Sequence, residues 1–152
     1  ERWRIPNVRM LRADASAFIR LVCPRDSLTA LHVFHPDPWP KKRHHKRRLF
    51  QPAFVDAACA CLKVGGRLAI QTDHAEYFEW ITAVLRSNAQ LASADFHDPA
   101  WRDGFLTHDS DAARGDVSLA APAATNAQLG TNFEIKYRRE GRPIASAAYV
   151  RI

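Results

Sequence analysis

Residues 27–40 read SLTALHVFHPDPWP, and the interpretation of the whole chain starts from them. The first nine, Ser27 to His35, are rich in aliphatic and β-branched residues, which is typical of a β-strand. Prolines at positions 36, 38 and 40 end the strand, because proline donates no backbone hydrogen bond and restricts the residue before it. The strand therefore leads into a stiff loop that carries one carboxylate, Asp37, and one indole, Trp39.

Elements of alternating type are expected on both sides of this strand. The apolar patterns predict further strands over residues 8–11, 67–73, 91–97 and 144–152, and helices over residues 15–22, 51–62 and 74–87. Gly65-Gly66 is expected to close the second helix as a left-handed cap. The apolar stripe of the third helix is Tyr77, Trp80, Ile81, Val84 and Leu85.

This alternation predicts an α/β fold with a doubly wound, mostly parallel sheet. A chain of 152 residues that is 47% hydrophobic can bury one core, so we expect a single domain over residues 1–152. Residues 98–129, rich in Ala, Asp, Ser and Pro, are too long for an ordinary connection and are expected to form a flexible loop or lid.

Three acidic residues, Asp14, Asp37 and Asp73, each follow a predicted strand. Ligands of open α/β sheets bind outside the carboxyl ends of the strands, so the three carboxylates are expected to meet at one rim. Helix capping explains Asp14 equally well, and Asp73 with Glu76 fits a capping box. Asp37 between two prolines also fits a turn in which its side chain bonds the backbone.

The positive charge of the chain is concentrated in one segment. There are 22 Lys and Arg against 16 Asp and Glu, a net charge of +6, and six of the cations lie between Lys41 and Arg48. A local patch of this kind is typical of a contact with a polyanion such as RNA. A solvated loop or a nuclear-localisation signal remains an alternative on charge alone.

Other features narrow the class of protein. No stretch approaches the ~20 apolar residues of a membrane span, and the charged start Glu1-Arg2-Trp3-Arg4 does not resemble a signal peptide. Three cysteines without metal-binding spacing favour reduced, buried thiols and a cytoplasmic protein. No metal site is expected, since His44 and His45 are surrounded by cations.

The segment Phe34–Arg48, with Leu62–Gly66 and Thr72-Asp73, closely resembles the bacterial tRNA (guanine-N7)-methyltransferases. The family's Phe-Pro-Asp-Pro-Trp loop appears here with His35 before the first proline, and its C-terminal Thr-Lys-Phe-Glu as residues 131–134, with Asn132 in place of lysine. The resemblance implies a Rossmann-like fold of class I, and methyl transfer from S-adenosylmethionine to N7 of guanosine 46 in the variable loop of tRNA. Members begin with two further strands and a glycine-rich cofactor loop that are not in this sequence, so the domain is expected to be incomplete and one strand edge open.

The resemblance also implies roles for single residues. Asp37 takes the catalytic position and contacts the cofactor, and Asp14 matches a second cofactor contact. The substrate contacts are Lys41, Asp73, Thr131, Asn132, Phe133 and Glu134. The tRNA contacts are Arg43, His44, His45, Lys46, Arg47 and Arg48.

Two other functions fit the same residues. The chain could be a non-catalytic RNA-binding subunit that retains tRNA affinity without methyl transfer. It could also be a nucleobase methyltransferase acting on an exocyclic amine, since such enzymes carry a related Pro-rich loop after the corresponding strand.

Overall fold

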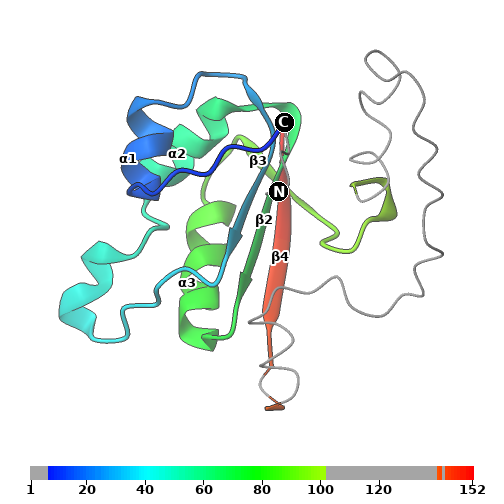
Figure 1. Ribbon diagram of the computed structural model, residues 1–152. Helices are drawn as coiled ribbons and strands as arrows, with labels where there is room; N and C mark the ends of the chain where they lie inside the picture. The colour runs from blue at the N-terminus through cyan, green and yellow to red at the C-terminus, as the bar shows by residue number, and fades with distance from the viewer. Residues whose placement is uncertain (1–6, 102–139, 142) are drawn as a thin grey trace, which may run out of the picture.

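The computed structural model describes residues 7–101, 140–141 and 143–152 (Figure 1). Its elements are α1 (Ala15–Leu21), β1 (Leu28–Phe34), the 3₁₀ helix η1 (Lys42–Arg47), α2 (Pro52–Cys61), β2 (Leu62–Thr72), α3 (Ala75–Arg86), β3 (Leu91–Ala94) and β4 (Ala145–Arg151). The alternation of helix and strand from α1 to β3 follows the sequence prediction, with boundaries that differ by a few residues.

The described strands form one sheet in the order β1-β2-β4-β3. β1 and β2 are parallel and are joined by a crossover through α2, whereas β4 runs antiparallel to both β2 and β3. The α/β, Rossmann-like fold is confirmed, and its described part is a mixed sheet. Within the described residues β1 pairs with β2 alone, so its outer edge is open, as the resemblance implied.

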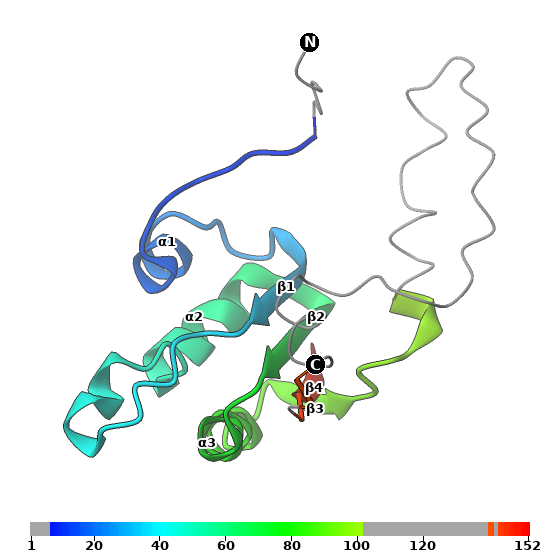
Figure 2. The same cartoon turned by 60° about the horizontal axis from the view of Figure 1, so that its bottom comes forward.

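Helices α1, α2 and α3 lie on the same face of this sheet (Figures 1 and 2). The doubly wound prediction places helices on both faces, but the helices that the structure describes cover one. The core between them and the sheet contains Ile19, Phe54, Leu68, Ile70, Tyr77, Ile81 and Leu85. Tyr77, Ile81 and Leu85 confirm the apolar stripe predicted for α3, and Trp80 and Val84 pack partly buried beside them.

Residues 8–11 do not form the predicted strand. Met10 is 94% exposed and Leu11 67% exposed, and the segment runs away from the sheet (Figure 2). A strand is stable only where its backbone groups pair with a neighbour, and no described strand lies beside these residues. The strand predicted for residues 8–11 is therefore wrong, because it was based on an apolar pattern alone.

Gly65-Gly66 is not the cap of the second helix. α2 ends at Cys61, and the next residue, its C-cap Leu62, is already extended and begins β2. Gly65 has a φ of 78° within β2, and a Cβ on Gly66 would lie 2.7 Å from the carbonyl oxygen of Lys63. The two glycines thus permit a tight irregularity in a strand, next to the shift of register between β1 and β2.

Cys59 and Cys61 are buried and Cys23 is partly exposed, and all three are free thiols. Burial, and secondarily the neighbouring Cys23, raises the pKa of Cys61 to about 11. The prediction of buried, reduced thiols is confirmed for the two cysteines of α2. Of the long loop predicted at residues 98–129, the part after residue 101 lies outside the described residues.

Candidate active site and RNA-binding surface

The loop between β1 and η1 has an unusual backbone. His35 and Trp39 have φ values of 51° and 43°, in the left-handed region that side chains other than glycine rarely adopt. Such a conformation costs on the order of 1–3 kcal/mol per residue and persists where surrounding contacts enforce it. One such contact is the hydrogen bond that the His35 N–H donates to the carbonyl of Gln71, at 2.8 Å. Asp37 lies between the two strained residues and is exposed.

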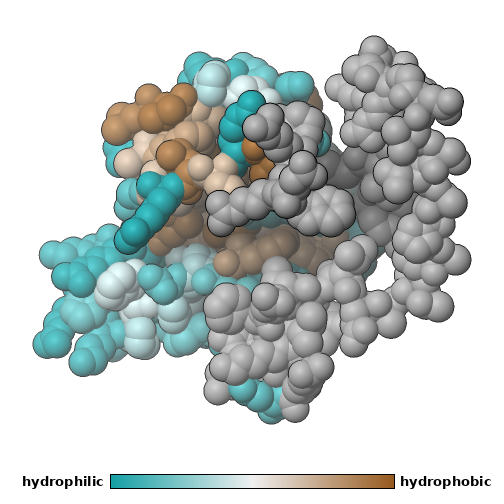
Figure 3. All heavy atoms as spheres, viewed as in Figure 1, coloured by the Kyte–Doolittle hydropathy of each residue, from teal (hydrophilic) through white to brown (hydrophobic). Residues whose placement is uncertain are grey.

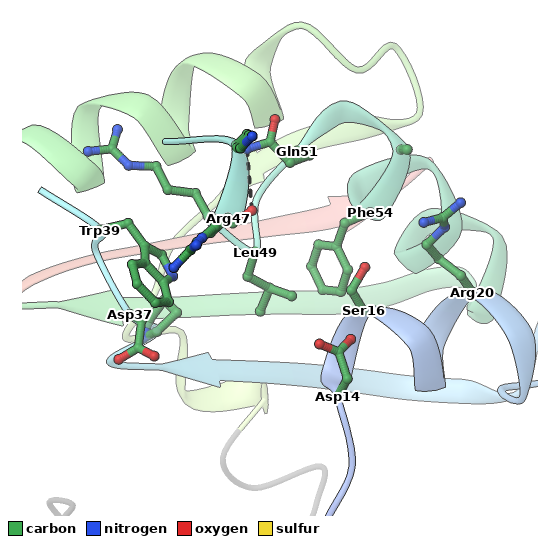
Figure 4. A pocket seen from close by; sticks show the side chains of 13 residues that line it. Asp14, Ser16, Arg20, Asp37, Trp39, Arg47, Leu49, Gln51 and Phe54 are labelled. Atoms are coloured by element: carbon green, nitrogen blue, oxygen red, sulfur yellow. Dashed lines mark hydrogen bonds between the residues drawn. The ribbon is translucent and has the colours of Figure 1, made fainter. Parts of the chain in front are cut away.

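A cleft of about 500 Å³ opens beside this loop. Asp37 and Trp39 line it from the loop, Asp14 from the start of α1, and Leu49 and Phe54 from the segment around α2. Figure 4 shows the carboxylates of Asp14 and Asp37 at the same side of the cleft, with the Phe54 ring behind Asp14. Arg20, Lys46, Arg47 and Arg48 also line it, so the cleft combines two acids and four cations with a few aromatic and aliphatic side chains.

Asp14 has a structural role as well as a place in the cleft. Its Oδ1 accepts a hydrogen bond from the N–H of Ala17 at 2.7 Å, which makes it the N-cap of α1. The capping interpretation is thus confirmed. It does not compete with a ligand contact, since the same carboxylate lines the cleft.

Asp73 follows β2 and lies apart from the residues that line the cleft. Its Oδ1 is 3.6 Å from Nδ1 of His35, so it adjoins the start of the Asp37 loop. The capping box predicted for Asp73 and Glu76 is wrong, because α3 begins one residue later: the N-cap is His74, whose Nδ1 accepts from the N–H of Tyr77 at 3.2 Å.

The cationic segment folds as η1 and presents most of its charges to solvent. Lys41, Lys42, Arg43, Lys46 and Arg47 are exposed. Figure 3 shows hydrophilic side chains gathered at the lower left, where Figure 1 places this segment. We name these five residues the cationic strip.

Both histidines of η1 and one of its arginines contact aromatic rings. The Arg47 guanidinium lies 5.1 Å from the centre of the Trp39 ring, and His44 meets the same indole edge-on at 5.9 Å. His45 contacts Trp80 of α3 at 5.9 Å. The contact of Arg47 with Trp39 joins the cationic strip to the wall of the cleft, so a polyanion bound on the strip would pass beside Asp37.

Arg48 differs from its neighbours because it is buried, with 2% of its surface exposed. Its guanidinium donates to both carboxylate oxygens of Glu76, at 3.0 and 2.8 Å, and its Nε donates to the carbonyl of Pro38 at 2.9 Å. The hydrogen bond from Arg48 is the main cause that lowers the pKa of Glu76 below its ordinary value. The expected tRNA contact of Arg48 thus falls on a buried guanidinium, three of whose five N–H groups are already bonded within the protein.

Of the expected substrate contacts, Lys41 is exposed at the start of the strip and Asp73 adjoins His35, whereas residues 131–134 lie outside the described residues. Sequence reasoning missed Glu76 as the partner of Arg48. The pairing leaves no sequence signal, because 28 residues separate the two side chains. Among the residues described, no group of three or more His, Cys, Asp or Glu is placed to hold a metal ion, and none of their helices is long and apolar enough to cross a membrane.

Comparison with known proteins gives a consistent picture. Residues 1–147 match a protein-family model described as "Putative methyltransferase". The chain is 52% identical over 155 aligned residues to a tRNA (guanine-N(7)-)-methyltransferase of Nocardia farcinica, covering all of this chain and 52% of the relative. It is 43% identical over 113 residues to the enzyme of the same name from Rhodococcus jostii, covering 74% of this chain and 44% of the relative. The chain thus spans about half the length of the curated relatives it matches.

Proposed function

Because the chain belongs to the methyltransferase family whose model it matches over residues 1–147, we propose that it acts in the transfer of a methyl group to N7 of a guanosine in tRNA. The relatives that carry this activity in their names support the substrate. From the loop sequence we infer guanosine 46 of the variable loop as the target. The observation that carries the proposal is the position of Asp37, in a cleft whose wall continues into the cationic strip.

The chemistry of guanine N7 suits this cleft. N7 carries a lone pair and no proton, so the reaction needs alignment and electrostatic stabilisation and no strong general base. As the N7–carbon bond forms and the sulfur–carbon bond breaks, positive charge passes from the sulfonium to the purine. The carboxylate of Asp37 stabilises that charge and accepts hydrogen bonds from the N1–H and the exocyclic amino group. Asp73 and Lys41 are proposed to hold the substrate from the two sides of the loop.

The methyl donor is proposed to be S-adenosylmethionine, which when bound supplies an electrophilic methyl group. The described residues fit one end of such a molecule. The carboxylate of Asp14 accepts hydroxyl or amino donors, and Leu49 and Phe54 offer apolar contact to a flat ring. The chain contains no G-x-G-x-G segment, so the proposal assigns no residue to the donor's amino-acid end.

The tRNA backbone is proposed to lie along the cationic strip, with the target base turned out of its stack toward Asp37. Trp39 stands between the strip and the acid and offers a face on which a base can stack. Arg43, His44, His45, Lys46 and Arg47 remain in the proposed contact set. Because tRNA and reduced thiols occur together in the cytoplasm, we place the activity there.

The test is the Asp37→Asn variant, which keeps the shape of the side chain and removes its charge. We expect methylation of tRNA by the full chain to fall at least a hundredfold, with tRNA affinity unchanged, since one preorganised group of this kind typically contributes about 10²–10³ in rate. Asp56→Asn, which changes an exposed acid on α2 outside the cleft, serves as the matched control.

Equal turnover of the Asp37→Asn and control variants would remove Asp37 from the mechanism. Tight tRNA binding without methylation by the unmodified chain would favour the non-catalytic RNA-binding function instead.

A further inference from the structure

We propose that Arg48 and Glu76 form a positioning pair that fixes the Asp37 loop against α3, and that Arg48 is not a tRNA contact. The inference rests on the proposed function, because it assigns the pair to the step that Asp37 performs. The two residues bring together the last position of the basic segment and the first turn of α3.

Two consecutive arginines have different environments at this point of the chain. η1 ends at Arg47, and Arg48 has a φ of −59° and a ψ of 136°, so the backbone becomes extended and the side-chain direction changes. Arg47 is exposed and lies over Trp39, whereas Arg48 turns inward and is 2% exposed. From the charge pattern of the sequence both residues were expected to contact tRNA, but only Arg47 is exposed, whereas Arg48 is buried.

The surroundings of the Arg48 guanidinium match the shape and the charge of a planar cation. It lies 5.0 Å from the centre of the Tyr77 ring and 5.2 Å from that of Trp80, both on α3. The carboxylate of Glu76 takes two hydrogen bonds in the fork geometry that only arginine offers. An ammonium of lysine could not reproduce this set of contacts.

The chain beyond Arg48 is fixed to the same helix. Trp80 Nε1 donates to the carbonyl of Phe50 at 2.9 Å, and the Phe50 N–H donates to the hydroxyl of Tyr77 at 3.5 Å. α3 thus holds the backbone two residues after Arg48 as well as its side chain. Arg48 is therefore a rigid support and not a mobile surface cation.

This support reaches Asp37 through one backbone group. Arg48 Nε donates to the carbonyl of Pro38, the residue after Asp37. His35 and Trp39, before and after Asp37, have positive φ values, which persist only where other contacts enforce them. The hydrogen bond from Arg48 to Pro38, which lies between these two residues, is one such contact. Loosening Arg48 would let the loop relax and move the carboxylate away from its working position.

The decisive variant is Glu76→Gln, because Glu76 is half exposed and the substitution keeps the size of the side chain while it removes the charge. Glu79→Gln, an exposed acid of the same helix, is the matched control. As simple surface acids, both residues would weaken tRNA binding slightly, so their removal would strengthen binding and leave kcat unchanged. As a positioning residue, Glu76 should behave differently: we expect kcat for methylation to fall about tenfold, as small misplacements of reacting groups do. The salt dependence of tRNA affinity should stay that of the control.

A second measurement does not need activity. The three prolines within residues 35–41 have no N–H. Hydrogen–deuterium exchange of a peptide that spans residues 33–41 therefore reports on the amides of His35, Asp37, Trp39 and Lys41. We expect exchange about fivefold faster in Glu76→Gln than in Glu79→Gln, since the loop opens more often. The conservative Arg48→Lys variant should show the same increase.

The outcomes separate the two proposals. If the unmodified chain methylates tRNA and Glu76→Gln matches Glu79→Gln in both kcat and exchange, the positioning role is refuted and the proposed function stands. If no methylation occurs, the proposed function fails, and the exchange comparison alone decides whether the pair holds the loop. A reduced salt dependence in Arg48→Gln, which removes the charge, would return Arg48 to the tRNA contacts and also refute the inference.

Discussion

Replacing Arg43, Lys46 and Arg47 by alanine should weaken tRNA binding in a way that depends on salt. All three side chains are exposed on η1, whereas the neighbouring Arg48 is buried and is left unchanged. Each phosphate that a cation neutralises contributes about 0.7–0.9 to the slope of log affinity against log salt. If each side chain contacts one phosphate, the slope should fall by about 2–3.

This change of slope corresponds to a large effect in a simple titration. Between about 50 and 200 mM salt, the ratio of the affinities at the two concentrations should shrink by roughly 20- to 40-fold relative to the unmodified chain. Filter binding or fluorescence anisotropy of a labelled tRNA at four or five salt concentrations gives the slope. The control removes three exposed cations elsewhere, Lys63, Arg25 and Arg86.

An unchanged slope in the η1 variant would refute the assignment of the strip to phosphate. An equal loss in the control variant would show that only net charge matters, and would refute the argument from position as well. A further arm adds Arg48→Gln to the η1 variant, and the slope should not change again, because the charge that it removes already lies beneath the surface.

Three further predictions concern stability and reactivity. Gly66→Ala should destabilise the fold by about 1–3 kcal/mol, as overpacking does, because the new Cβ would lie 2.7 Å from the carbonyl oxygen of Lys63. Chemical denaturation measures the change in the free energy of unfolding, and an unchanged value would contradict the geometry. The pKa of Glu76 is lowered from 4.5, chiefly by the hydrogen bond from Arg48. The stability difference between the unmodified chain and Glu76→Gln should therefore be constant well above pH 4.5, shrink as the pH falls through 4.5, and be lost below the lowered pKa of the folded state. A difference that persists in stronger acid, measured by denaturation at each pH, would exclude the ion pair. Iodoacetamide should label Cys23 first in the native chain, since Cys61 is buried and its pKa is about 11. Mass spectrometry measures the rate at each cysteine, and equally fast labelling of Cys61 would contradict its burial.

The sequence predicted the main elements because their patterns are local. The aliphatic and β-branched run before the prolines lies within one strand and the apolar stripe of α3 within one helix, and both are found as expected. Residues 8–11 carry a similar apolar pattern, but a strand also needs a neighbour, which a local pattern does not reveal. Gly65 was misinterpreted for the same reason, since a positive φ serves a helix end and an irregular strand equally well.

The candidate site was predictable where a residue's position in the chain decides its position in space. Asp37 follows a strand, and Asp14 begins a helix beside it, so both reach one cleft. The burial of Arg48 could not be predicted, because its environment is made by Tyr77 and Trp80, about thirty residues later. Contacts between distant segments are set by packing, and a charge count cannot detect them.

The place of Glu76 in the first turn of α3 has a thermal consequence. Helix ends open more readily than the interior of a fold, whereas Tyr77, Ile81 and Leu85 of the same helix are fully buried and open only with the whole domain. On warming, the carboxylate should release the guanidinium while the apolar interior is still closed. Heat inactivation would then precede the calorimetric melting transition, and cooling would restore turnover, since nothing has aggregated.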